Sequence, residues 1–168
     1  PNAFAMVNPN RLDDTSNLNH LAAVGVTFMF LTALNRKLRT SDWFIKNNIK
    51  EPKLISYLDI VALGTICDVV PLKGLNRLFV LKGIDVMNKK QNFGINALIE
   101  KSSIKSKISP YDLGFKLGPR INAAGRLGRS SFGTELLTSK DKVKANEIAD
   151  QLDKFNKERK TIESHVLD

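Results

Sequence analysis

The sequence contains few of the residues that usually form disulfides, zinc sites or catalytic triads. It has one cysteine, Cys67, and two histidines among 168 residues. A single cysteine excludes an internal disulfide and a cysteine-rich zinc site, and it favours a reducing compartment such as the cytoplasm. The histidines, His20 and His165, lie far apart in the sequence, so no histidine cluster or Ser/His/Asp triad is indicated.

Long apolar runs and phosphate-binding loops are also missing. No stretch of about 20 apolar residues is present, so the sequence predicts no membrane-spanning segment. The most apolar stretch, residues 21–34, is interrupted by Gly25 and Thr27 and is typical of a core helix. The sequence contains no Walker-type loop, no GxGxxG unit after a strand and no HExxH motif, which excludes the classes that those motifs define.

Positive charge is abundant and unevenly distributed. The formal net charge is +9, yet residues 140–168 carry equal numbers of basic and acidic side chains. Residues 101–129 hold seven basic residues against one acid, Asp112, a net charge of +6. Such a segment attracts a polyanion, most commonly nucleic acid. A solvated basic surface is the alternative, and charge alone does not separate the two.

Apolar periodicity and turn residues predict a mainly helical chain. One strand is expected at residues 3–7, where an apolar run stops at Asn8-Pro9. A glycine-rich turn is expected at residues 118–128. The expected helices cover residues 18–38, 53–66, 76–87, 95–100 and 130–137, with a further helix starting at Ser109-Pro110.

The last segment predicts one long helix. Its apolar seam steps by three and four residues, the spacing of a heptad repeat, through Ile148, Leu152, Phe155, Arg159, Ile162 and Val166. Thr138, Ser139 or Asp141 can cap its start. We expect residues 139–168 to connect residues 1–138 to another domain, and a terminal helix packed on its own domain is the alternative.

Two carboxylates occur in an otherwise apolar stretch. Asp59 lies within the helix expected at residues 53–66, and Asp68 follows the end of that helix. A buried charge is costly unless it is paired or binds a metal. Asp59 and Asp68 are nine residues apart, about 900° around a helix, so they face opposite sides. At most one of them is therefore a metal ligand. Asp68 is favoured because it precedes a turn that ends at Pro71, and Asp59 is expected to cap or pair structurally.

The segment from Gly114 to Gly128 combines glycines with forked cations. Its glycines permit close backbone approach to a ligand. The guanidinium groups of Arg120 and Arg126 suit a phosphate, and Asn122 adds an amide. A phosphate cradle is one interpretation, and a glycine-rich connector is the other. Phe115 is the aromatic residue nearest to this basic segment, and we expect it in the core.

Taken together, these stretches resemble a known family. The residues Ala62–Leu72 (ALGTICDVVPL), Asn76-Arg77, Asp112–Phe115 (DLGF) and Gly118–Arg126 (GPRINAAGR) closely resemble the RecJ single-stranded-DNA exonucleases of the DHH phosphoesterase superfamily. Their order and spacing also match, as do Val7–Pro9, Gly25–Phe28 and Asn156–Arg159. The resemblance extends over essentially the whole chain.

The resemblance implies a fold and an activity. The chain is expected to be the helical C-terminal half of an α/β DHH-type domain, followed by a long interdomain helix that leads to a second domain. RecJ-like enzymes hydrolyse single-stranded DNA from the 5′ end to mononucleotides with Mn²⁺ or Mg²⁺, in DNA repair and recombination. The last metal-binding acid corresponds to Asp68. The segment containing Arg120, Asn122 and Arg126 lies near the DNA path.

Departures from the family pattern limit these expectations. The family's early Asp-x-Asp, its middle Asp and its Asp-His-His triplet are absent from the chain. We therefore expect a piece of a longer protein that is inactive alone and that self-associates through cut surfaces. The alternatives are a phosphodiesterase of the same superfamily acting on short oligonucleotides or cyclic dinucleotides, and a non-catalytic DNA-binding scaffold.

Overall fold

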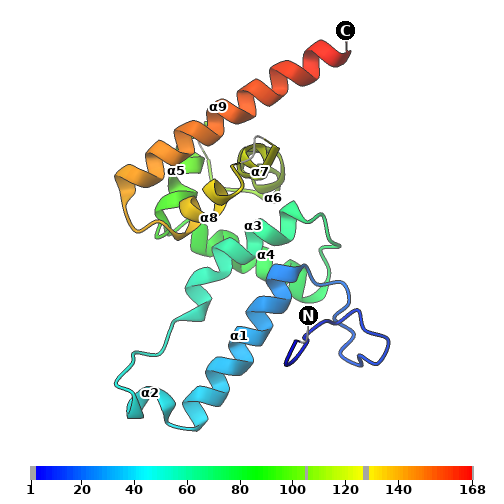
Figure 1. Cartoon of the computed structure of the whole chain (residues 1–168), viewed down its shortest axis with the longest axis vertical. Helices are drawn as coiled ribbons and strands as arrows, with labels where there is room; N and C mark the ends of the chain where they lie inside the picture. Colours follow the sequence, from blue (N-terminus) through cyan, green and yellow to red (C-terminus); the bar gives the residue numbers. More distant parts are fainter. Residues whose placement is uncertain (1–2, 105, 127–128, 168) are drawn as a thin grey trace. The chain divides into compact units, whose positions relative to one another are not determined.

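The structure is a set of helices joined by loops (Figure 1). It is a computed structural model that describes residues 3–104, 106–126 and 129–167, without the side chains of Arg126 and residues 165–167. The prediction of a mainly helical chain is confirmed. The strand predicted at residues 3–7 is wrong, because these residues are exposed and irregular. A strand needs a neighbour for its backbone hydrogen bonds, and the described part of the chain contains no second strand.

The chain divides into two compact units, Pro1–Gly83 and Ile84–Asp168. The first unit begins with an irregular segment and continues with α1 (Ala23–Thr40), α2 (Trp43–Lys46), η1 (Leu54–Tyr57) and α3 (Leu58–Cys67). The helix α4 (Gly74–Met87) starts in this unit. The helix expected at residues 53–66 therefore begins as the 3₁₀ turn η1 before it becomes α3.

Small residues let the helices of the first unit approach one another closely. The rings of Phe28 on α1 and Phe79 on α4 meet edge to face, with 5.4 Å between their centroids. A Cβ atom on Gly25 would lie 3.4 Å from the Phe79 ring. A Cβ atom on Gly83 would lie 2.2 Å from the backbone oxygen of Leu58. A side chain at residue 83 would thus force α3 and α4 apart.

The second unit contains α5 (Phe93–Lys101), α6 (Pro110–Asp112), η2 (Leu113–Leu117), α7 (Gly118–Arg126), α8 (Ser131–Thr138) and α9 (Lys142–Leu167). Its helices pack on the first half of α9, as the orange part of that helix shows in Figure 1. Asp141 caps α9 by accepting a hydrogen bond from the backbone N–H of Val143 at 2.8 Å. One of the three predicted caps is therefore used.

The buried hydrophobic residues of the second unit gather against α9. They are Val86, Met87, Ile95, Ala97, Leu98, Ile108, Leu113, Leu117, Ala123, Ala124, Leu136, Ala145, Ile148, Ala149 and Leu152. Along the predicted seam of α9, Ile148 and Leu152 are buried, whereas Ile162 is exposed. Only the first half of the seam is thus covered within this unit.

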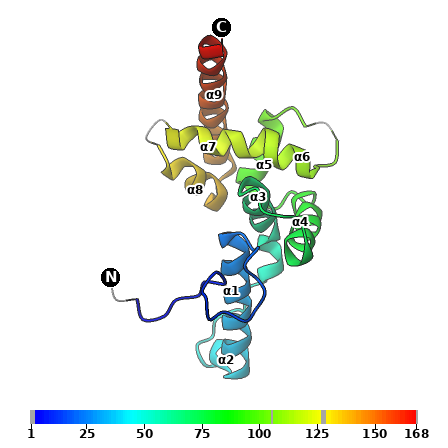
Figure 2. The same ribbon diagram turned by 90° about the vertical axis from the view of Figure 1, so that its right-hand side faces the viewer.

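The glycine-rich turn predicted at residues 118–128 is wrong over most of its length, because Gly118–Arg126 is helical; residues 127–128 lie outside the described residues. Helical glycines are unfavourable in isolation, by about 1 kcal/mol each relative to alanine. Burial of Ala123 and Ala124 in the core offsets that cost. In Figure 2 this helix runs on from α6, with no loop between them.

A π-helical turn, η2, accommodates the proline within this continuous helix. The backbone N–H of Gly118 donates to the carbonyl of Leu113, five residues earlier. Proline lacks an N–H and its ring crowds the preceding turn of a helix. The wider turn that precedes Pro119 relieves this crowding. The side chain of Arg120 on α7 donates to the backbone carbonyl of Lys116 within the turn.

Candidate functional site

Asp68 lies in an exposed turn that follows the last residue of α3. Its own backbone is close to helical, with φ −82° and ψ −2°. Val69 then adopts a left-handed conformation with φ 56°. This conformation is strained for a β-branched residue, at a cost on the order of 1–3 kcal/mol. Among the described residues the Asp68 carboxylate has no hydrogen-bond or ion-pair partner, so it is free to bind a ligand.

Asn76 holds this turn in place from the first turn of α4. Its side chain is fully buried. The Nδ2 group donates to the backbone carbonyl of Pro71 at 3.0 Å and to that of His20 at 2.8 Å. One amide therefore ties the turn after Asp68 to the segment that precedes α1. Asn76 is part of one of the motifs that carry the family resemblance, but the sequence alone predicted no structural role for it.

Asp59 has the opposite environment to Asp68. It lies in the first turn of α3, where the helix dipole favours a carboxylate, and it is buried. Burial raises the pKa of its carboxyl group, and the backbone N–H of Ile60 donates to it at 2.7 Å. The two acids lie near opposite ends of α3, about 13 Å apart along the axis. They do not converge on one site.

The described residues do not form a complete metal site. Nowhere in this part of the chain do three or more His, Cys, Asp or Glu side chains come together as ligands. Mn²⁺ and Mg²⁺ are bound by about six ligands, mostly oxygens. Asp68 can offer one carboxylate to such a site, and the other protein ligands would have to come from outside the described residues.

Arg120 is engaged within the second unit. Its Nε donates to Oδ1 of Asp153 on α9 at 2.8 Å, and its Nη1 donates to the backbone carbonyl of Lys116 at 2.7 Å. The side chains of Arg120 and Asp153 are only 14% and 11% exposed. The pair therefore anchors α7 on α9, and Nη2 of Arg120 has no hydrogen bond among the described residues.

The charge of Asp153 is stabilised despite its burial. Burial by itself raises the pKa of this carboxyl group, but Lys157, whose Nζ lies 2.8 Å from Oδ2, and Arg120 outweigh that effect. The pKa of Asp153 is consequently lower than usual. Asp153 therefore stays ionised to a lower pH in the folded chain than an ordinary aspartate does.

The other predicted phosphate-binding residues lie on α7. Asn122 is exposed, and its amide has no bond within the described structure. Arg126 is the last residue of α7, and its side chain lies outside the described part. Arg120 and Asn122 are therefore brought together on one helix of the second unit, whereas Asp68 belongs to the first unit.

Acids neutralise part of the basic segment at residues 101–129. Lys101 pairs with Asp150 of α9 at 2.5 Å, and Lys116 pairs with Asp112 at 2.8 Å. Lys107 is exposed and has no ion pair within the described structure. The surface charge of this segment is therefore smaller than its sequence predicts. Asp150 lies far from the segment in sequence, which is why its contribution could not be foreseen.

Phe115 is not in the core, contrary to expectation. Its side chain is 68% exposed and that of Tyr111 is 63% exposed. The two rings stack on each other, with 4.7 Å between their centroids and 26° between their planes. The buried positions of this helical stretch are instead Leu113 and Leu117, so the aromatic pair lies on its outer side.

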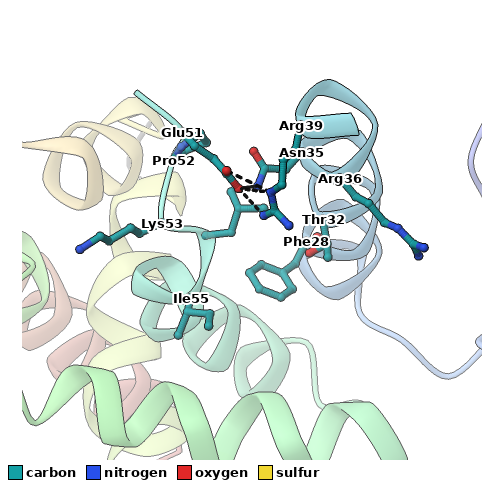
Figure 3. Close-up of a pocket in the computed structure, with 10 residues that line it drawn as sticks. Phe28, Thr32, Asn35, Arg36, Arg39, Glu51, Pro52, Lys53 and Ile55 are labelled. Carbon is teal, nitrogen blue, oxygen red and sulfur yellow. Dashed lines mark hydrogen bonds and ion pairs between the residues drawn. The ribbon is translucent and has the colours of Figure 1, made fainter. Parts of the chain in front are cut away.

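A cavity of about 770 Å³ in the first unit lies between α1 and the segment at residues 51–55 (Figure 3). Glu51 closes one side of it, where it accepts hydrogen bonds from Arg39 and, at 2.7 Å, from the Nδ2 group of Asn35. The hydrogen bond from Arg39 lowers the pKa of Glu51. Phe28 and Ile55 supply apolar walls. None of the predicted site residues lines this cavity, and Arg39, one of the two arginines in its lining, is paired with Glu51.

Comparison with known proteins places this geometry in a family. The single-stranded-DNA-specific exonuclease RecJ of Dickeya dadantii is 45% identical over 166 residues, which cover 98% of the chain and 29% of that relative. The RecJ proteins of Escherichia coli (44%, 97% of the chain, 29% of the relative) and Bacillus subtilis (32%, 100% of the chain, 20% of the relative) match similarly. No family model matches the chain.

Solved structures define the class of fold. Crystal structures of RecJ from Thermus thermophilus in complex with Mg²⁺ and with Mn²⁺ align with 74% of the chain and with 20% and 18% of those chains. Each alignment has a TM-score of 0.64 at 31% identity. The helices thus reproduce one part of a metal-binding nuclease. The chain belongs to the RecJ family, and it spans less than a third of the length of the relatives it matches.

Replacement of Asn76 by alanine is expected to lower the free energy of unfolding by about 2 kcal/mol, because two buried carbonyl groups lose their donor. Urea denaturation of the chain measures this effect. Asn88→Ala is the matched control, since Asn88 is an exposed asparagine that donates to a carbonyl at 2.9 Å immediately after α4. Equal losses in the two variants would show that Asn76 does not hold the turn.

Replacement of Asp153 by asparagine is expected to cost about 2 kcal/mol at pH 7, because Arg120 keeps a largely buried charge without its anion. The folded-state pKa of Asp153 lies below the ordinary value of about 3.9. The stabilisation is therefore complete at a pH above the ordinary pKa of aspartate, and it is lost as the pH falls through the folded-state pKa.

Urea denaturation at pH 7, 5 and 3 tests both parts of this expectation for Asp153. The difference between wild type and Asp153→Asn should be constant from pH 7 to 5 and smaller at pH 3. Asp150→Asn breaks the more exposed pair with Lys101 and should change stability little. A difference for Asp153→Asn that grows toward acidic pH would contradict the account.

Proposed function

We propose that the chain is a working part of a RecJ-type exonuclease, which as an intact protein hydrolyses single-stranded DNA from the 5′ end to mononucleotides. In this proposal Asp68 contributes one carboxylate to the metal site, and the second unit contacts the DNA backbone. The observation that carries the proposal is the near-complete match of the chain to proteins named single-stranded-DNA-specific exonucleases, at 32–45% identity.

The environment of Asp68 supports its assignment as a ligand. It is exposed, unpaired within the described residues and set in a strained turn that the buried Asn76 secures. Asp59, nine residues earlier, is buried and lies in the first turn of α3. Mn²⁺ or Mg²⁺ is the expected cofactor of the intact protein, because solved relatives bind these ions. The ligands beyond Asp68 are not in the chain, so the chain alone is expected to be inactive.

The second unit supplies the proposed DNA contacts. Asn122 presents a free amide on α7, and we propose that Arg126 and the remaining Nη2 group of Arg120 reach phosphate oxygens beside it. Contacts of this kind follow the backbone rather than the base edges, so binding should be independent of sequence and sensitive to salt. Cytoplasmic DNA repair and recombination is the proposed setting. None of the described helices is long and apolar enough to cross a membrane.

Digestion of a 5′-phosphorylated single strand by the intact protein tests the role of Asp68. Wild type should release mononucleotides from the 5′ end with Mn²⁺, and Asp68→Ala should lose at least a hundredfold in rate, because one metal ligand is removed. Asp150→Asn, which alters an exposed acid on α9, should keep the wild-type rate.

Three other results of the digestion would each overturn part of the proposal. Equal rates for wild type and Asp68→Ala would make Asp68 structural. Cleavage of short oligonucleotides or cyclic dinucleotides, with long strands left intact, would support an oligonucleotide phosphodiesterase. Binding without cleavage by wild type would support a non-catalytic scaffold.

A further inference from the structure

Tyr111 and Phe115 form an exposed aromatic pair that the proposed chemistry does not use. Both residues are about two-thirds exposed, and their rings stack with 4.7 Å between their centroids. Large aromatic side chains usually bury most of their surface, so an exposed pair indicates a surface that binds something. Every contact that defines the pair lies within the second unit.

The fold holds the pair rigidly. Ser109 starts the helix with a capping box, in which its hydroxyl accepts from the N–H of Asp112 and the Asp112 carboxylate accepts from the N–H of Ser109 at 3.0 Å. The π-helical turn η2 contains Phe115 and begins directly after α6. Turns of this kind are rare and occur frequently at functional sites. The buried side chains of Leu113 and Leu117 fix the turn against the core.

The pair lies on the same helical rod as the proposed phosphate-binding residues. Asn122 follows Phe115 by seven residues along the same continuous helical stretch, and both are exposed. Seven residues correspond to roughly 10 Å along a helix axis. Two adjacent nucleotides of an extended strand can span this distance. A strand whose phosphate is at Asn122 can therefore place a base at the aromatic rings.

Charge around the pair favours an anionic occupant. Lys107 lies in the loop four residues before Tyr111, is exposed and is unpaired within the described residues. Lys116 follows Phe115 and is half-buried against Asp112, the one acid in the segment from 101 to 129. Two acids of α9, Asp150 and Asp153, are paired with Lys101 and Arg120. A protein partner with an apolar face explains the rings but not the surrounding cations.

We propose that Tyr111 and Phe115 form a stacking platform for a base of single-stranded DNA, with the strand's phosphates held on α7. This inference rests on the proposed function and adds a base-binding subsite to it. Stacking tolerates any base because every base has a π face, and it distinguishes a single strand, whose bases are free, from a duplex, whose bases are already stacked. The platform thus gives the surface a preference for single strands without reading sequence.

Fluorescence anisotropy of the intact protein tests the platform with two labelled probes in EDTA, which prevents cleavage. One probe is an oligothymidylate, and the other is a strand of the same length without bases but with the same phosphates. Wild type should bind the thymidylate more tightly. Phe115→Leu and Tyr111→Leu should each weaken thymidylate binding by about tenfold and leave binding of the abasic strand unchanged. Phe115→Trp should retain the preference.

Controls separate stacking from a loss of folding. Phe93→Leu removes an exposed aromatic ring from α5 in the same unit and should not change the ratio of the two affinities. Because both rings of the pair are exposed, the melting temperature should stay within a few degrees of wild type in each leucine variant. A variant that melts much earlier while the ratio is unchanged would show that protein covers the pair, and this would overturn the platform.

The two proposals fail in different ways. If wild type binds neither probe, the proposed DNA contacts of the second unit fail. If wild type and the leucine variants bind with the same ratio of affinities, the platform fails and the phosphate contacts stand.

Discussion

The ion pair between Arg120 and Asp153 is the interaction on which the surface of the second unit depends. It joins α7 to α9 through side chains that are nearly buried, at an N–O distance of 2.8 Å. The same guanidinium donates to the carbonyl of Lys116 in the π-helical turn, so one side chain stabilises both the irregular turn and the contact between helices. Without it, the helical stretch that carries Tyr111, Phe115 and Asn122 would lose its anchor.

The first unit is organised around a different constraint. Asp68 is exposed at the end of an apolar helix, and a strained residue, Val69, follows it directly. Asn76 stabilises that arrangement by donating to carbonyls on both sides of the turn. In both units a buried polar side chain supports an exposed one nearby. This division between supporting and contacting residues is typical of binding sites whose geometry is set before the ligand arrives.

Helical periodicity allowed much of the fold to be predicted from the sequence. The positions of α4, α5, α8 and α9 agree with the predicted helices, and Ser109 caps a helix as expected. The glycines of residues 118–126 misled the prediction, since local propensity favours a turn and tertiary packing on α9 overrides it. The strand predicted at residues 3–7 failed because pairing depends on a partner strand that local sequence cannot specify.

The candidate site was less predictable than the fold. The motif around Asp68 identified an acid whose exposure and unpaired state agree with a ligand role, and that role stays a prediction. Arg120 was chosen for its forked donors, but its main partner, Asp153, lies 33 residues away and could not be inferred from spacing. Phe115 was expected in the core, but it lies two residues from each of the buried Leu113 and Leu117 and therefore faces the outer side of the helical stretch.

Hydrogen–deuterium exchange of the intact protein, with and without a bound single strand, tests the central claim most directly. The claim is that the second unit presents residues 110–126 to single-stranded DNA, whereas the cavity between α1 and residues 51–55 takes no part. Binding of an oligothymidylate in EDTA is predicted to slow exchange in residues 110–126 and to leave residues 28–55 unchanged. Slowed exchange confined to residues 28–55, with no change in residues 110–126, would contradict the account.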